Sequence, residues 1–433
     1  MFAGTYPVLI VAVECMRFHV LQNLGTSDDP DRTRKGSWSR WSETPYSGPI
    51  ATLDPMRADD IAVYIDPHTR HLFDDRLFER ESNPYAGDSI LAPYAAVHDR
   101  LVAAGITVHT ADLLPDRPDG RQNIVISYGT PYRMPSQATT RYRALARRTD
   151  VRLSAFFAME CPVVEPGMYA ELPALHQLFR RVLSWSDSPS LLPFTGAPVS
   201  VERFWWPQSF DGVHEQLWQR QDRKFLVMMN ANKLPRLYEQ ELYTERLRAV
   251  EYFHQFDEID LYGRNWDRAP ARVGKTRVPT IMRRAGERAW ELRQRIAPDA
   301  LYTAAAAATR GPARSKSETF AQYQFALCFE NSILTGWMTE KLFDCFFTGT
   351  VPVYWGAPDI LEWVPADCFI DMREFRDYAQ LRSFLHALTP AQVQGYREAA
   401  RAYLASPQYA PFRLATWVDL HARIIHADTG VQV

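Results

Sequence analysis

The chain has 433 residues, of which 46% are hydrophobic and 23% charged, and this is the composition of a soluble globular protein with two or three domains. Its 49 Lys and Arg against 51 Asp and Glu leave a net charge of −2, which argues against a nucleic-acid-binding protein. The five cysteines are scattered without a CxxC pair, as is typical of reduced thiols in the cytoplasm. The apolar run at 6–13 is too short to span a membrane, so we expect a cytoplasmic protein without a transmembrane anchor.

The first half of the chain alternates short apolar runs with helical patterns. A helix is predicted over Ala92–Ala104, ended by Gly105. The stretch 25–49 has no periodicity and is predicted to be a loop. Strands are predicted at Val8–Val13, Ile61–Ile65, Ile106–His109, Asn123–Ser127 and Leu153–Met159. Continuous apolar strands separated by helices indicate a parallel sheet that is covered on both faces.

A second series of the same kind follows a stretch rich in Pro, Ser and Trp at 186–222, which we interpret as a connection between domains. The predicted strands are Phe225–Met229, Ile259–Tyr262, Phe325–Phe329 and Val351–Trp355, and the predicted helices are Tyr238–Phe253 and Glu340–Thr348. The sequence therefore predicts an α/β protein with domains at 1–210 and 211–410 and a helical tail at 411–433.

The segment 268–316 breaks the even charge balance, with twelve Lys and Arg against three acidic residues. A solvated helical excursion with a basic face would explain it. Contact with donor or acceptor phosphates, or with an anionic membrane surface, would explain it equally well.

The segment 323–371 contains the most informative pattern. Its apolar strand delivers Glu330 and Asn331 at its carboxyl end, where open α/β sheets bind ligands. Thr339 is a good N-cap, and Glu340 and Lys341 follow it in the first helical turn. Free backbone N–H groups, the helix dipole and a lysine suit a diphosphate. A capped helix with a solvated Glu–Lys pair explains the same residues, so the pattern alone leaves both interpretations open.

The sequence of this segment contains FENS, followed by TEKLFD and GTVPVYWGAPD. It resembles the donor-binding signature of glycosyltransferase family 10, the α-1,3/1,4-fucosyltransferases. FFAMECPVVEPGMY, LFRRVLSWSDS, KFLVMMNAN, ERLRAVEYF and DLYGR resemble further family segments, in family order. The resemblance covers about 151–371 and leaves the segment 268–316 outside the shared core. It implies a bacterial-type member with the GT-B fold, in which two Rossmann-like domains with parallel sheets face a cleft.

The resemblance also implies roles for individual residues. Glu160 matches the family's general base, and at the end of an apolar strand we expect partial burial to raise its proton affinity. Arg246 matches an arginine that contacts the donor diphosphate. Among the donor-binding residues, Lys341 is assigned to the phosphates, Trp337 replaces a tyrosine of some relatives, and Glu330 and Asn331 shape the loop. The full predicted donor set is Arg246, Glu330, Asn331, Trp337, Thr339, Glu340 and Lys341.

The implied function is inverting transfer of L-fucose from GDP-fucose to a hydroxyl of a glycan acceptor, in an α-1,3 linkage. We expect no metal and no further cofactor, because no acidic pair is placed to hold Mg²⁺ or Mn²⁺. Partners would be GDP-fucose, the acceptor and, through 268–316, the inner membrane surface, but no nucleic acid. Use of another GDP-deoxyhexose or nucleotide sugar, and a non-catalytic glycan-binding protein, remain the alternatives.

Overall fold

The computed structural model describes residues 56–79, 91–131, 135–274 and 279–433. The predicted strand Val8–Val13 and the predicted loop 25–49 lie outside these ranges. Within them the chain forms two six-stranded sheets in which every pair of neighbouring strands is parallel. The α/β class predicted from the sequence is therefore confirmed.

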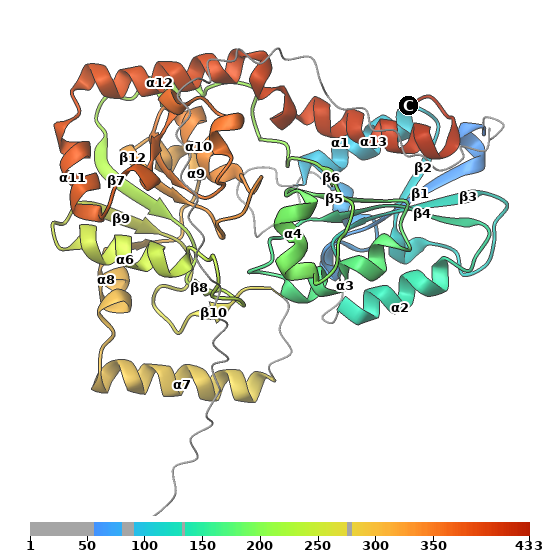
Figure 1. The fold of residues 1–433 in the computed structure, drawn as a ribbon, viewed down its shortest axis with the longest axis horizontal. Coiled ribbons are helices and arrows are strands. Elements are labelled where there is room, and N and C mark those ends of the chain that lie inside the picture. Colours follow the sequence, from blue (N-terminus) through green and yellow to red (C-terminus); the bar gives the residue numbers. More distant parts are fainter. Residues whose placement is uncertain (1–55, 80–90, 132–134, 275–278) are drawn as a thin grey trace, which may run out of the picture. The chain divides into compact units, whose positions relative to one another are not determined.

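The first sheet is drawn in blue to green in Figure 1 and has the strand order β2-β1-β3-β4-β5-β6. All six residues of β1 are buried, which agrees with the continuous apolar run that predicted it. Helices α1 and α13 cover one face of this sheet, and α2 and α3 cover the other. The strands are β1 (Ile61–Asp66), β2 (Thr107–Thr110), β3 (Gln122–Tyr128), β4 (Val151–Ala158), β5 (Arg181–Ser184) and β6 (Glu202–Arg203), and the helices α1 (Ala92–Ala103), α2 (Pro135–Leu145) and α3 (Pro166–His176).

The stretch 186–222 is more than the connection that its composition suggested. It contains α4 (Ser188–Thr195), the edge strand β6 and the short helix α5 (Glu215–Trp218). The Asp187 side chain caps α4 by accepting a hydrogen bond from the Ser190 N–H (2.9 Å). Gly196 ends the same helix in the left-handed region at φ 67°. The prolines favoured the interpretation of this stretch as a connection, although it contains a capped helix.

The second sheet has the strand order β11-β9-β7-β12-β13-β14. Counted along the chain, this is the order 3-2-1-4-5-6 of dinucleotide-binding folds. Helices α6, α8 and α11 pack on one face, and α10 and α12 on the other. The elements are β7 (Lys224–Met229), β9 (Ile259–Tyr262), β11 (Thr309–Gly311), β12 (Tyr323–Phe329), β13 (Val351–Trp355), β14 (Ile370–Asp371), α6 (Tyr243–His254), α8 (Ala300–Ala308), α9 (Lys316–Phe320), α10 (Glu340–Thr348), α11 (Tyr378–Ala387) and α12 (Pro390–Ala405).

The last helix, α13 (Leu414–Thr429), confirms that 411–433 is helical, but it packs on the first sheet. The Tyr128 hydroxyl of β3 lies 2.7 Å from His421 Nε2. The buried carboxylate of Asp428 pairs with Arg180 and Arg181 at 3.1 and 3.0 Å. The helix at 414–429 therefore covers part of one face of the first sheet. The domain boundary at 210 stays a prediction, and it falls between the end of β6 and the start of β7.

The basic segment 268–316 leaves the second sheet after β9. A small parallel pair, β8 (Lys233–Leu234) with β10 (Ala271–Arg272), precedes the helix α7 (Thr280–Ile296). The segment then continues through α8 and β11 to the start of α9. In the described ranges no helix combines the length and hydropathy needed to cross a membrane.

Candidate functional site

The strand order of the second sheet singles out one place for a ligand. The chain winds outward from β7 in one direction and from β12 in the other, and these two strands are neighbours. Ligands of such sheets bind outside the carboxyl ends of the strands at this switch point. Asn230 follows β7 there, and Glu330 and Asn331 follow β12. The structure thus brings the predicted loop residues to the expected edge.

Glu330 is the centre of a buried hydrogen-bond network at this edge. Its side chain is 0% exposed. Its carboxylate accepts hydrogen bonds from the Thr339 N–H (2.7 Å), the Thr339 hydroxyl (2.8 Å) and Lys341 Nζ (3.2 Å). Gly356, after β13, lies against it, since a Cβ there would be 2.5 Å from Glu330 Cγ. The buried charge of Glu330 therefore orients both Thr339 and Lys341.

Lys341 is held as a cation at the start of α10. Loss of hydration works against its charge, but the nearby carboxylates of Glu330 and Glu340 outweigh this and raise the pKa of the ammonium group. Its side chain is 20% exposed, and Nζ also lies 2.8 Å from the Thr339 hydroxyl. A partly exposed ammonium group whose charge is favoured and which lies at a helix start is suited to an anionic ligand.

Glu340 is ionised in the same helical turn. Loss of hydration opposes its ionisation, but the charges of Lys341 and Lys316 lower the pKa of its carboxyl to about 2. The side chain is 43% exposed, and one carboxylate oxygen lies 3.6 Å from Lys341 Nζ. An open carboxylate can accept hydrogen bonds from hydroxyl groups of a ligand.

The N-terminus of α10 carries no side-chain cap, although Thr339 stands at the predicted N-cap position. Its hydroxyl donates to Glu330 and accepts from Lys341 Nζ, and it makes no hydrogen bond to the first-turn N–H groups. The N–H groups at the start of this nine-residue helix keep their capacity to donate to an anion. Thr339 thus acts through Glu330, and the helix start is left for a ligand.

Arg246 is a buried residue of α6. Its guanidinium donates to the Phe329 carbonyl (2.7 and 3.2 Å) and to Asn331 Oδ1 (3.0 Å). Burial lowers the pKa of the guanidinium, and the nearby acidic groups of Tyr243 and Glu330 oppose that shift. Arg246 fastens α6 to the end of β12, and Asn331 shapes the loop as predicted. The contact of Arg246 with a diphosphate stays a prediction.

Trp337 lies in the hydrophobic core. Its ring is buried and packs against Trp185, with 4.8 Å between ring centroids. Its indole Nε1 is buried and has no hydrogen-bond partner among the described residues. The main neighbours of the ring are therefore apolar. The predicted contact between Trp337 and the donor stays a prediction.

The expected partial burial of Glu160 is wrong. Glu160 lies two residues beyond β4, as expected, but it is exposed, so burial cannot be what raises its proton affinity. The Tyr169 hydroxyl donates to the Glu160 carbonyl (2.8 Å) and fixes the backbone there. Burial raises the pKa of the Tyr243 phenol, and the negative charge of Glu160 adds to this rise while Arg246 opposes it. Glu160 is therefore within electrostatic range of the residues around Arg246.

Two residues near the site were not identified from the sequence. The Tyr243 ring lies 4.7 Å from the Arg246 guanidinium carbon, and their spacing of three residues on a helix could have predicted the contact. Lys316, assigned only to the basic segment, lies 3.3 Å from Asp344 of α10 and adds positive charge near Glu340. Its partner is distant in the sequence, so no local pattern pointed to it.

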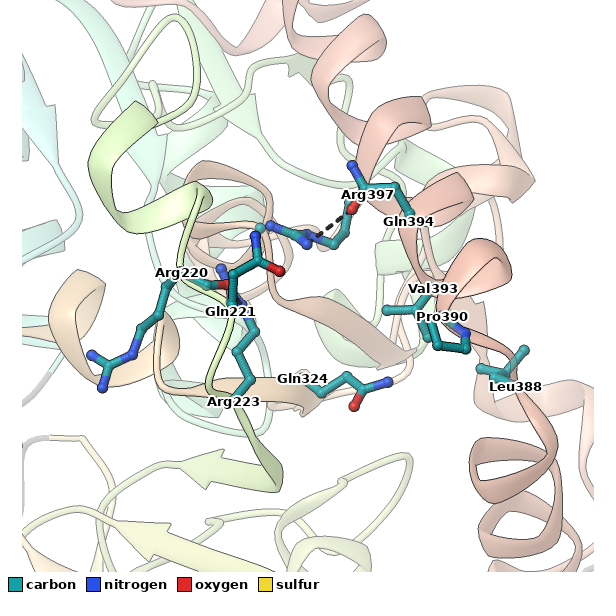
Figure 2. Close-up of a pocket in the computed structure, with 10 residues that line it drawn as sticks. Arg220, Gln221, Arg223, Gln324, Leu388, Pro390, Val393, Gln394 and Arg397 are labelled. Carbon is teal, nitrogen blue, oxygen red and sulfur yellow. Dashed lines mark hydrogen bonds between the residues drawn. The ribbon is translucent and has the colours of Figure 1, made fainter.

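The second sheet also has a pocket at a distance from Glu330. Figure 2 shows a pocket of about 450 Å³ near the amino ends of β7, β12 and β13, opposite the edge with Glu330. Arg223 lines it, but its guanidinium already donates to the carbonyls of Leu217 (3.0 Å) and Thr348 (2.9 Å). Arg397 likewise donates to Gln394 (2.9 Å). These arginines hold loops and helices together, so we place the candidate site at the carboxyl edge.

Comparisons with known proteins address the same region. Residues 238–399 match the model of the C-terminal domain of glycosyltransferase family 10 (fucosyltransferase). Over these residues the chain is similar to that domain. This domain includes α6, β12, α10 and β13, and therefore Arg246, Glu330 and Lys341, whereas Glu160 lies outside it. The resemblance to this family inferred from the sequence is thus supported over residues 238–399, which contain Arg246, Glu330 and Lys341.

Curated relatives and solved structures give shorter or weaker matches. A stretch of 75 residues is 33% identical to the alpha-(1,3)-fucosyltransferase FucT of Helicobacter pylori and covers 17% of this chain and 16% of that protein. A stretch of 69 residues is 42% identical to the GDP-fucose protein O-fucosyltransferase 3 of Bos taurus, covering 16% and 14%. A crystal structure of an alpha1,3-fucosyltransferase with GDP aligns over 88% of this chain and 96% of that one, at 14% identity and a TM-score of 0.41.

Proposed function

We propose that this protein is an inverting glycosyltransferase that transfers L-fucose from GDP-fucose to an acceptor hydroxyl. The observation that carries the proposal is the position of Lys341. It is a cation held by Glu330 at the uncapped start of α10, beside the switch point of the second sheet. A diphosphate is the ligand that such a site suits best. The family 10 domain match and the GDP-fucose in the name of the bovine relative support GDP-fucose as the donor.

In the proposed reaction, an acceptor oxygen attacks C1 of the fucose from the face opposite the GDP. The new bond joins C1 to that oxygen, the bond between C1 and the phosphate oxygen breaks, and the configuration at C1 is inverted. Glu160 takes the proton of the acceptor hydroxyl, for which its exposed carboxylate at the end of β4 is accessible. The GDP leaves with the bonding electron pair and gains negative charge. Lys341, Arg246 and the start of α10 stabilise that charge.

For the acceptor we propose a glycan hydroxyl and an α-1,3 linkage, which the name of the Helicobacter pylori relative supports. A hydroxyl of a polypeptide side chain is the second candidate, because other matching relatives are named protein O-fucosyltransferases. We propose a cytoplasmic location on the composition and cysteine pattern alone. Both acceptors require the same donor site and the same base.

The donor proposal is tested by thermal shift with a panel of GDP-fucose, other GDP-sugars and UDP-sugars. We expect stabilisation by GDP-fucose and GDP, and weaker stabilisation by the UDP-sugars. Preference for another GDP-deoxyhexose would replace the donor sugar and leave the fold and site as described. Strong binding of GDP-fucose without any release of GDP in the presence of acceptors would favour a non-catalytic glycan-binding protein.

A further inference from the structure

Helix α7 (Thr280–Ile296) in the basic segment presents its apolar side chains to solvent. None of its seventeen residues is buried. Ile281 is 79% exposed, Met282 63%, Leu292 58% and Ile296 76%. Large apolar side chains at such exposure on one helix mark a contact surface, because single scattered ones are ordinary but a cluster is not.

These side chains share one face of α7. At about 100° per residue, Ile281, Ala285, Ala289, Leu292 and Ile296 fall in one stripe about 80° wide, and Met282 lies at its edge. The residues that are partly buried lie on the other side. These are Glu287, Trp290 and Gln294, and the Trp290 ring contacts Tyr302 of α8, with 5.6 Å between centroids. The apolar stripe therefore points away from the rest of the described chain.

The charges of α7 are ordered around this stripe. On the same angular count, Arg288 and Arg295 border one side of the stripe and Arg293 borders the other. The two acidic residues, Glu287 and Glu291, lie on the far side, and Glu287 pairs with Arg283 at 3.2 Å. Arginines at the borders of an apolar face can extend their charged ends to anionic groups while their stems cover apolar surface. Acidic side chains would be kept away from those groups.

We propose that α7 lies in the plane of an anionic membrane surface, with its apolar stripe among the acyl chains and its bordering arginines at the lipid head groups. This arrangement is typical of in-plane amphipathic helices, which have a strong apolar face, basic borders and a low overall hydrophobicity. The mean hydropathy of α7 is low, as its five arginines require. The helix would hold the enzyme at the surface without crossing it.

A second copy of the chain is a poorer occupant of the same face. Two α7 helices packed stripe to stripe would bring Arg288, Arg293 and Arg295 of one copy close to those of the other. Like charges at such a border oppose association. The anionic head groups of a bilayer complement them, and each Arg near an anionic surface favours binding about fivefold.

The test is co-sedimentation of the full chain with phosphatidylcholine vesicles, with and without phosphatidylglycerol. We expect wild type to bind the anionic vesicles and to bind less as salt rises. Leu292→Glu/Ile296→Glu should lower the partition coefficient by at least about tenfold, since burial of one Leu or Ile side chain favours transfer by about ten- to a hundredfold. Arg288→Glu/Arg293→Glu should lower it on anionic vesicles by more than about twenty-fivefold, since two arginines are lost.

Val102→Glu/Leu113→Glu is the matched control. It makes the same chemical change at two exposed apolar residues outside α7, which are 47% and 43% exposed. We expect this control to bind vesicles as wild type does, and all variants to keep their circular dichroism spectrum and their affinity for GDP. The binding assay needs no turnover, so its failure would leave the proposed transferase function intact.

Equal vesicle binding by wild type and Leu292→Glu/Ile296→Glu would overturn the proposal. Loss of vesicle binding in the control as well would also contradict it, because net charge would then be the cause. If wild type bound no vesicles but associated with itself in analytical ultracentrifugation, and the α7 variant did not, the stripe would be an interface between copies.

Discussion

Lys341→Met separates the two interactions that we assign to Lys341. In the free protein the ammonium group balances the buried carboxylate of Glu330, at 3.2 Å. In the complex we expect it to bind the diphosphate as well. Methionine keeps much of the length and apolar volume of the side chain and removes the charge. The variant should therefore lose stability and ligand affinity for two distinct reasons.

The stability loss follows from the burial of Glu330. Removal of one partner of a buried ion pair costs up to about 3–5 kcal/mol, because the remaining charge is uncompensated. The expected value lies below the top of this range, since Lys341 is 20% exposed and Glu330 keeps two hydrogen bonds from Thr339. The affinity loss follows from the lost contact with phosphate. A charge-assisted hydrogen bond contributes about 1.5–3 kcal/mol, or roughly 10- to 150-fold in Kd for GDP.

The double variant Glu330→Gln/Lys341→Met distinguishes these effects. A neutral glutamine removes the uncompensated charge, so we expect the free energy of unfolding, measured with urea, to recover most of the loss. We expect the Kd for GDP, measured by calorimetry, to remain raised as in Lys341→Met. If the double variant regained wild-type affinity for GDP, Lys341 would act only by neutralising Glu330, and its assignment to the phosphates would be wrong.

Arg246→Lys keeps a charge but loses the paired hydrogen bonds to the Phe329 carbonyl. We therefore expect the free energy of unfolding to fall by about 1–3 kcal/mol and GDP to bind more weakly. An unchanged melting temperature would contradict the role of Arg246 in joining α6 to β12. Transfer should survive EDTA, because the cationic side chains supply the charge that the leaving GDP needs; loss of activity with rescue by Mn²⁺ would show a metal requirement. Burial lowers the pKa of His421 to about 4, from an ordinary 6.5, so the folded state favours its neutral form. As the pH falls, the unfolded chain therefore takes up the proton before the folded chain does. About 3 kcal/mol of stability, present above pH 6.5, should be lost between pH 6.5 and 4. We expect a smaller loss over this pH range in His421→Gln.

The parts of the second sheet that local signals define were predicted closely. The structure has Ile259–Tyr262, Glu340–Thr348 and Val351–Trp355 at the predicted bounds. Gly349, at φ 69°, ends α10 as its position in the sequence indicated. These signals lie within the elements themselves, so they can be recognised without knowledge of the fold.

Where distant contacts decide the backbone, the predictions failed. The helix predicted from Tyr238 begins only at Tyr243, because Leu242 donates to the Asn331 carbonyl (3.2 Å) and Glu241 forms a β-bridge with Ser332. The loop after β12 therefore holds this segment outside the helix.

The candidate site shows the same division. Lys341 and Glu340 could be recognised from a helix start and a family motif. The central position of Glu330 could not, because its partners come from beyond β12 and from α10 and meet only in the folded chain. The expected partial burial of Glu160 was wrong, since an apolar strand before a carboxylate does not determine whether the carboxylate itself is covered.

In the proposed reaction, this chain transfers fucose from GDP-fucose with Glu160 as the base. The most direct test is GDP release together with mass spectrometry of glycan and polypeptide acceptors, comparing wild type with Glu160→Gln. We expect wild type to add one fucose per GDP released. In Glu160→Gln, kcat should fall by about 10²–10⁴-fold at an unchanged Kd for GDP. Near-normal turnover by this variant would contradict the role of Glu160 as the base, and no fucose transfer by wild type to any acceptor would contradict the proposed function.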